Sequence, residues 1–301
     1  MLQRIDPIAT SEDIRETYLR YLTTTFGLKN PELTKQFRDL ARDTEGLFKG
    51  PILEATPKYS KDKSLLEMLT EPHPILSDQF LNYAPGLDEN EVAHCIPLER
   101  RLYTHQGRAI RRIVGQNRNV VVATGTGSGK TECFLLPIID HLLKERAANR
   151  LGPGVRALLV YPMNALANDQ VIRLRKLLPA ETGITFGRYT GQTKQTYRQG
   201  LDAFQQENDR IPQVNELFCR DQILGNEPVT GKDWPHKGYP PLVGPPHILL
   251  TNFAMLEYLL MRPQDSVLFD GVQGETWRFL VLDEAHIYTC LLYTSPSPRD
   301  S

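Results

Sequence analysis

Short, nearly continuous apolar runs alternate with amphipathic stretches from about residue 99 onward. The runs cover residues 119–124 (NVVVAT), 157–162 (ALLVYP), 184–189 (ITFGRY), 247–252 (HILLTN) and 279–284 (FLVLDE). Between them, residues 131–144 and 165–178 carry apolar side chains at helical spacing. This alternation predicts an α/β fold in which helices cover both faces of a parallel sheet. Ligands of such sheets bind at the carboxyl ends of the strands, so the residues that directly follow each run are the first candidates for chemistry.

Residues 1–98 have a different pattern, mostly helical with irregular connections. Ser11 precedes two acidic residues and a helical apolar pattern, which predicts an N-cap, and Asn30 before Pro31 predicts a second one. We expect a helical accessory domain at 1–98 and an α/β domain at 99–289. The polar, Gly- and Pro-rich stretch at about 192–246 predicts a surface insertion in the second domain.

Composition narrows the class of protein. The chain has 301 residues, of which 40% are hydrophobic and 24% charged, values typical of one or two globular domains. Its formal net charge of −1 means that any contact with nucleic acid must come from a local surface. No apolar run approaches the ~20 residues of a membrane span, and the N-terminus lacks the apolar core of a signal peptide. We therefore expect a cytoplasmic protein without a membrane partner.

A glycine-rich loop follows the first apolar run and precedes a helical pattern. It consists of Thr124, Gly125, Thr126, Gly127, Ser128, Gly129, Lys130 and Thr131. Glycines allow backbone amides to converge on phosphate oxygens, and the positive end of the following helix points at the same anion. In this interpretation Lys130 reaches the β- and γ-phosphates of ATP and the Thr131 hydroxyl binds Mg²⁺. The alternative is a structural turn, and Thr124 stands where the general motif has its first glycine.

An acidic pair, Asp283 and Glu284, ends the last apolar run. A carboxylate at a strand end can hold Mg²⁺, and its neighbour can orient or deprotonate an attacking water. The alternative is a solvated acidic pair. Together with the glycine-rich loop and the following Ala285-His286, the pair indicates a nucleotide hydrolase.

Asp-Glu-Ala-His at 283–286 resembles motif II of superfamily 2 helicases, and other motifs follow in the family's order. The segments LYTHQGRAI (102–110), YPMNALANDQ (161–170), GRYTGQT (187–193) and ILLTNFAMLEYLL (248–260) resemble the adenine-recognition element, motif Ia, motif Ib and the next DNA-contact motif. The residues of these motifs are most similar to those of large bacterial DEAH-box helicases of the MrfA-like and phage-defence (DISARM-like) kind. The resemblance covers about 102–289 and implies a first RecA-like lobe.

The resemblance also assigns roles to individual residues. Gln106 reads adenine, Asp283 positions Mg²⁺, Glu284 is the catalytic base, and His286 couples the nucleotide site to the nucleic-acid site. The expected catalytic residues are thus Lys130, Asp283, Glu284 and His286, and Gln106 joins the phosphate loop in binding the nucleotide. The nucleic-acid contacts that it implies are Pro162, Asn164, Thr190, Gly191, Thr251 and Asn252. Small polar residues at strand ends suit a grip on a phosphate backbone. Two alternatives stay open: both asparagines could be helix caps, and Gln106 could be an ordinary surface residue.

The last residues, 290–301 (CLLYTSPSPRDS), differ from everything before them. Residues 290–300 can be back-translated into a string that resembles a transposase adapter of sequencing libraries, whereas the alternative is a genuine Ser/Pro-rich terminus. We expect native sequence to about Thr289. The chain would then be an N-terminal fragment without the second lobe, whose arginine finger is worth ~10³–10⁵ in rate in related hydrolases.

For the intact protein we expect an ATP-dependent DNA helicase or translocase, with RNA the less favoured substrate. The fragment itself is expected to bind nucleotide or nucleic acid weakly at most and to unwind nothing. The alternatives are an ATP-dependent switch or scaffold, and a motor subunit of a restriction or phage-defence complex that does not separate strands. Subunits of a defence or repair complex are the partners that these alternatives imply.

Overall fold

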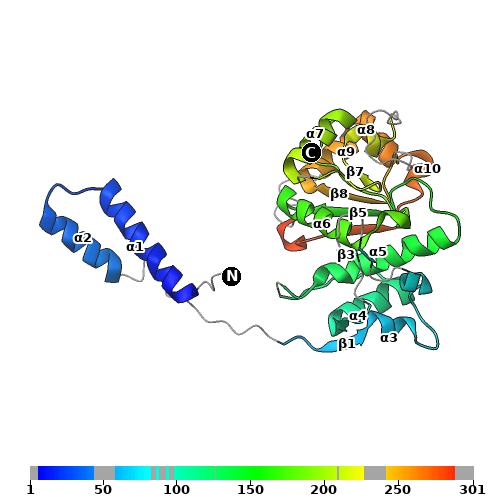
Figure 1. Cartoon of the computed structure of the whole chain (residues 1–301), viewed down its shortest axis with the longest axis horizontal. Coiled ribbons are helices and arrows are strands. Elements are labelled where there is room, and N and C mark those ends of the chain that lie inside the picture. The colour runs from blue at the N-terminus through cyan, green and yellow to red at the C-terminus, as the bar shows by residue number, and fades with distance from the viewer. Residues whose placement is uncertain are drawn as a thin grey trace, which may run out of the picture. The chain divides into compact units, whose positions relative to one another are not determined.

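The computed structural model describes residues 6–43, 58–82, 86–87, 93–94, 98–125, 127–208, 210–226 and 242–288. The chain divides into two compact units, Met1–Lys58 and Tyr59–Ser301, each of which is shown in Figure 1. This division falls earlier than the boundary expected near residue 98, because the segment after Tyr59 packs on the α/β unit.

The first unit is a pair of helices, α1 (Pro7–Thr25) and α2 (Pro31–Asp43). The helix α1 begins before Ser11, so the predicted Ser11 cap is wrong. Asp6 caps it instead and accepts hydrogen bonds from the backbone amides of Ile8 (3.0 Å) and Ala9 (3.3 Å), since Pro7 already has the φ of a first helical residue. The second cap is confirmed, because the Asn30 side chain accepts from the amide of Glu32 at 2.9 Å.

The segment before the phosphate loop forms a small layer of the second unit. Its elements are β1 (Lys61–Ser64), α3 (Leu65–Leu69), a 3-10 helix (Asp78–Asn82), β2 (Gly86–Leu87), β3 (Ala93–His94), β4 (Arg101–Tyr103), α4 (Thr104–Ile110) and a π-helix (Arg111–Gly115). Strand β1 pairs with β4 and β2 with β3, both antiparallel. Leu65, Phe80 and Ile110 are fully buried in the same core as the main sheet, which joins this layer to the α/β unit.

Five parallel strands form the main sheet. In spatial order they are β7 (Glu216–Leu217), β6 (Phe186–Arg188), β8 (Ile248–Asn252), β5 (Ala157–Tyr161) and β9 (Phe279–Leu282). All described pairings between them are parallel. The predicted α/β class is therefore confirmed, and the carboxyl ends of these strands lie along one edge of the sheet.

Helices cover both faces of this sheet (Figure 1). They are α5 (Lys130–Ala147), α6 (Asn164–Leu177), α7 (Tyr197–Asn208), α8 (Arg220–Leu224), α9 (Phe253–Met261) and α10 (Gly271–Gly274), with 3-10 helices at Ala180–Thr182, Pro263–Leu268 and Ala285–Ile287. Alternate residues of β5 enter different cores. Leu159 packs in one core with Ile138 of α5, and Leu158 in the other with Leu259 of α9. Burial on both faces explains why β5 reads as a continuous apolar run.

Two expectations about the α/β unit need correction. Residues 119–124 form no strand, and the Val121 side chain is 94% exposed. A strand exists only where a neighbour shares its backbone hydrogen bonds, and none of the described strands pairs with this stretch. The insertion at 192–246 is also more than a surface loop: it contributes α7, the edge strand β7 and α8.

Candidate functional site

The phosphate loop leads directly into α5, which starts at Lys130. Gly127 and Gly129 both have φ of +72°, a conformation that favours glycine. A Cβ at Gly129 would also lie 2.5 Å from the Gln106 side chain, whereas a Cβ at Gly127 would meet nothing within 4 Å. Two features thus favour glycine at position 129: the positive φ of its backbone and the close approach of the Gln106 side chain. Thr126 lies outside the described residues.

Hydrogen bonds within the loop hold its ends together. The Lys130 ammonium donates to the backbone carbonyl of Thr124 at 3.1 Å. The hydroxyls of Thr124 and Ser128 lie 2.6 Å apart, and the Ser128 carbonyl contacts the His105 ring at 3.0 Å. These bonds hold Thr124, at the start of the loop, close to Ser128 and to Lys130 in the first turn of α5.

Gln106 lies against this loop and is buried. Its amide nitrogen donates to the carbonyl of Gly129 at 2.8 Å, and its amide oxygen accepts from the backbone of Tyr103 at 2.7 Å. The alternative of an ordinary surface residue is wrong. Its role toward adenine stays a prediction, but its contact with the loop is direct.

Glu132 is a part of the site that the sequence analysis missed. It lies in the first turn of α5 and is 9% exposed. One carboxylate oxygen accepts from Arg100 at 2.7 Å and from Arg173 of α6 at 2.6 Å, and the other lies 3.4 Å from the Gln106 amide. An acidic residue two positions after the loop lysine was the available signal, but its two arginine partners come from distant segments. The cluster ties α6 to the start of α5.

The acidic pair stands at the end of β9. The Asp283 amide donates to the carbonyl of Val160 at 3.0 Å, which aligns this turn with the end of β5. Burial raises the pKa of the Asp283 carboxyl above its usual range, and the charge of Glu284 raises it further. The Glu284 amide, which donates to Asp283 at 3.0 Å, and the Lys130 ammonium both lower that pKa. The loop lysine and the strand-end carboxylate therefore lie within range of each other's charge.

Glu284 and His286 follow in an exposed turn. Glu284 has φ of +49°, unusual for a residue with a side chain. Its carboxylate lies 3.3 Å from the ring nitrogen Nδ1 of His286, whose side chain is 75% exposed. Both side chains are thus available to groups that approach this edge of the sheet.

The predicted nucleic-acid contacts divide into two groups. Thr190 and Thr251 are fully buried, and the Thr251 hydroxyl donates to the carbonyl of Tyr189 at 2.7 Å. Asn252 and Asn164 meet across the strand ends, with the amide of the first donating to the oxygen of the second at 2.6 Å. Asn252 also caps α9, so the cap alternative is confirmed for that residue.

Asn164 is the first residue of α6 and makes no cap bond, so the cap alternative is wrong there. Gly191 is exposed, and Pro162 is half-buried at the end of β5. At this edge of the sheet, Gly191 and the asparagine pair therefore present more surface than the two threonines.

Two other features are absent from the residues that the structure describes. No group of three or more His, Cys, Asp and Glu side chains in the described part of the chain could hold a metal ion. None of the helices described there combines the length and the apolar character of a membrane span.

The site combines a phosphate loop, a strand-end Asp-Glu pair and a row of polar residues on one parallel sheet. These features are typical of nucleotide-binding α/β domains. Residues 103–214 match the family model described as DEAD/DEAH box helicase, and this part of the chain is a DEAD/DEAH box helicase domain. The resemblance expected from the motifs is confirmed.

Two individual relatives share less than a third of their aligned residues with this chain. The chain is 29% identical to the Druantia protein DruE of Escherichia coli (strain UMEA 4076-1), over 93% of this chain and 18% of that protein. It is 27% identical to the uncharacterized ATP-dependent helicase MJ1574 of Methanocaldococcus jannaschii, over 62% of this chain and 21% of that protein. The chain therefore spans about a fifth of the length of these relatives.

Among solved structures, the DUF1998 helicase MrfA bound to DNA and AMPPNP matches with a TM-score of 0.40 and 23% identity. The match covers 76% of this chain and 23% of that one. A likeness at this level supports no inference about ligands.

Proposed function

We propose that the α/β unit is the nucleotide-binding lobe of an ATP-dependent DNA helicase or translocase. One observation carries this proposal: Lys130 at the start of α5 lies close enough to Asp283 at the end of β9 for its charge to lower the pKa of that carboxyl. A cation for phosphates beside a carboxylate for a metal ion is the arrangement that nucleotide hydrolysis requires.

The residues fit ATP and Mg²⁺. The space beside Gly127 is open, so phosphate oxygens could approach its backbone. Burial disfavours the charged form of Asp283, and a divalent cation would offset that cost. Lys130 would hold the phosphates, and Thr131 with Asp283 would hold Mg²⁺. The bound nucleotide would supply the phosphoryl group whose hydrolysis drives the motor.

The chain's own side chains then have separate tasks. Glu284 would accept the proton of the attacking water, and its contact with His286 links that carboxylate to the exposed edge of the sheet. Gln106 positions the loop by its bond to Gly129, and in this proposal its buried place beside the loop also brings it to the adenine.

Nucleic acid would lie along the carboxyl ends of β5, β6 and β8. The proposed contacts are Pro162, Asn164, Gly191 and Asn252, with Thr190 and Thr251 supporting the turns beneath. Such contacts grip a phosphate backbone, so binding should weaken steeply with salt. The choice of DNA over RNA, and a role within a repair or defence complex, rest on the resemblance of the motifs.

Nucleotide binding tests the proposal. Equilibrium dialysis with labelled ATP and Mg²⁺ should show binding by the wild-type chain, which we expect to be weak, and none by Lys130→Ala. Lys176→Ala is the matched control, because Lys176 is an exposed lysine of α6 outside the site. Equal binding by Lys130→Ala and wild type would refute the assignment of the loop. For the intact protein, ATP hydrolysis without strand displacement on a forked DNA would indicate an ATP-dependent switch instead of a helicase.

A further inference from the structure

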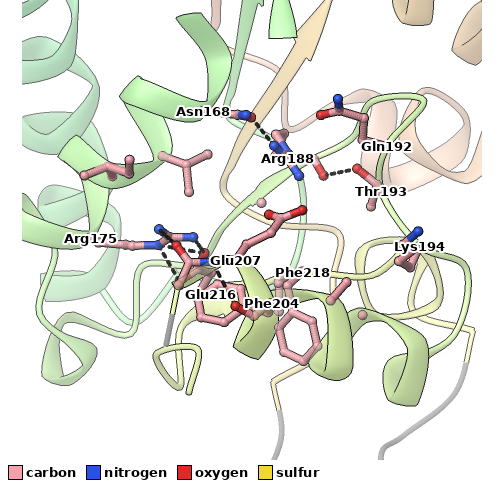
Figure 2. Close-up of a pocket in the computed structure, with 17 residues that line it drawn as sticks. Asn168, Arg175, Arg188, Gln192, Thr193, Lys194, Phe204, Glu207, Glu216 and Phe218 are labelled. Atoms are coloured by element: carbon pink, nitrogen blue, oxygen red, sulfur yellow. Dashed lines mark hydrogen bonds and ion pairs between the residues drawn. The ribbon is translucent and has the colours of Figure 1, made fainter. Parts of the chain in front are cut away.

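A cavity of about 180 Å³ lies between α6, β6, α7 and β7, and none of its lining residues belongs to the phosphate loop or to the Asp-Glu pair (Figure 2). Its lining includes Arg188 at the end of β6 and Gln192, the neighbour of Gly191, which is proposed to contact nucleic acid. The nucleotide site does not use this cavity, although Gly187, Arg188, Gln192 and Thr193 of its lining belong to the segment that resembles motif Ib.

Arg188, the last residue of β6, places one positive charge in the cavity, which Arg175 and Lys194 also line. One of its terminal nitrogens donates to the amide oxygen of Asn168, a neutral partner (Figure 2). No carboxylate forms an ion pair with Arg188 in the described part of the chain. Burial lowers the pKa of Arg188 below its usual range, which indicates a cation that the protein compensates incompletely. A guanidinium has five N–H donors, so several can serve a ligand.

Glu207 of α7 provides the opposite charge. Its carboxylate points toward Arg188 from the other side of the cavity (Figure 2), and its charge raises the pKa of Arg188. The two groups form no ion pair, although both line the same space. The nearby Arg175 and Glu216 differ, because they bind each other through contacts of 2.9, 2.9 and 2.5 Å. Hydrogen-bonding capacity is thus left open on Arg188 and Glu207.

The remaining walls are mixed: Asn168, Gln192, Thr193, Lys194 and Asn208 contribute polar groups, and apolar side chains line the rest. Val171 and Ile172 of α6 and Ala203 of α7 line the space, and Phe204 carries the Arg175 guanidinium over its ring at 4.8 Å. An apolar cavity of about 150 Å³ holds a benzene ring, so this one has room for a planar heterocycle. The ligand should therefore be flat, with acceptors on one edge for Arg188 and donors for Glu207.

We propose that this cavity binds a guanine base of a single-stranded nucleic acid. Guanine presents O6 and N7 as acceptors, the pattern that arginine recognises most often. Its N1–H and N2–H₂ groups are donors that a carboxylate can accept. Adenine instead has an amino donor in place of O6, which opposes the N–H groups of Arg188. Single-stranded bases splay into such pockets and are read on these edges.

This inference rests on the proposed function, since a strand must pass over the end of β6 for one of its bases to enter. Contacts with the phosphate backbone alone would be largely independent of the base sequence. A guanine site in this cavity would add a preference for one base.

Fluorescence anisotropy with short oligothymidines tests it. One central thymine is replaced by guanine, adenine, inosine or 7-deazaguanine, and binding is measured at low salt. Guanine should raise the affinity of the wild-type chain on the order of tenfold over thymine. Inosine lacks the amino group that faces Glu207 and 7-deazaguanine lacks N7, so each should lose part of this gain.

Variants assign the gain to the two residues. Arg188→Gln and Glu207→Gln should each abolish most of the guanine preference and keep binding to plain oligothymidine, whereas Lys176→Ala should keep both. Glu207 is exposed, so its variant is expected to fold even if a change at Arg188 disturbs β6.

Two results would overturn the inference while leaving the proposed function intact: equal wild-type affinity for all the oligonucleotides, and a guanine preference that survives in Glu207→Gln. If the wild-type chain binds no oligonucleotide while ATP still binds, the nucleic-acid part of the proposed function fails together with this inference.

Discussion

His247 makes the stability of the α/β unit depend on pH in a way that can be worked out from its surroundings. The buried ring lies just before β8, where its Nδ1 accepts from the backbone amide of Thr185 at 2.8 Å. Its Nε2 is then protonated and donates to the carbonyl of Gly152 at 3.1 Å. Burial, and then the charge of Arg156, lower the pKa of His247 to about 4. Protonation of Nδ1 would remove one of the bonds that tie the starts of β6 and β8 together.

The size of the effect follows from the two states of the protein. Unfolded chains take up the proton near the ordinary value of 6.5, whereas the folded chain takes it up near 4. The free energy of unfolding is therefore unaffected by this group above about pH 6.5 and falls as the pH decreases toward about 4. The difference between these pKa values corresponds to a loss of about 3 kcal/mol.

Urea unfolding at a series of pH values measures this loss. Wild type should lose about 3 kcal/mol more than His247→Gln between about pH 7 and about pH 4, because carboxylates and other histidines titrate equally in both. His73→Gln, which changes an exposed histidine, should keep the full wild-type slope. Equal slopes for wild type and His247→Gln would refute a neutral, buried His247.

Three further substitutions test the core and the site by denaturant unfolding. Glu132→Ala leaves Arg100 and Arg173 without their shared carboxylate and should cost about 1–3 kcal/mol; a stability within error of wild type would mean that the cluster does not hold α6 to α5. Leu250→Ala empties a fully buried position of β8 and should cost about 2–5 kcal/mol, and a loss below 1 kcal/mol would contradict that packing. Asn252→Ala removes the cap of α9 and the bond to Asn164 and should cost about 1 kcal/mol, and a stability equal to that of wild type would contradict the capping role.

The features that depend on short stretches of the chain were predictable before the fold was known. The apolar runs at 157–162, 184–189, 247–252 and 279–284 predicted β5, β6, β8 and β9, and the helical spacing at 131–144 and 165–178 predicted α5 and α6. The phosphate loop was predictable for the same reason. Glycines that adopt positive φ, a following helix start and a Lys-Thr pair are all encoded within eight neighbouring positions, Thr124 to Thr131.

Which of these stretches contact each other depends on how the sheet and its helices pack. Residues 119–124 have strand-like composition, but a strand also needs a partner, and none of the described strands pairs with them. Glu132 gains its role from Arg100 and Arg173, and the cavity gains its opposed charges because β6 brings Arg188 to face α7 and Glu207. The spacing of apolar residues along a short stretch determines whether it forms a helix or a strand, and which face of that helix or strand is apolar. The partners of a charged side chain come from segments far away in the sequence, so they are set only when the sheet and its helices pack.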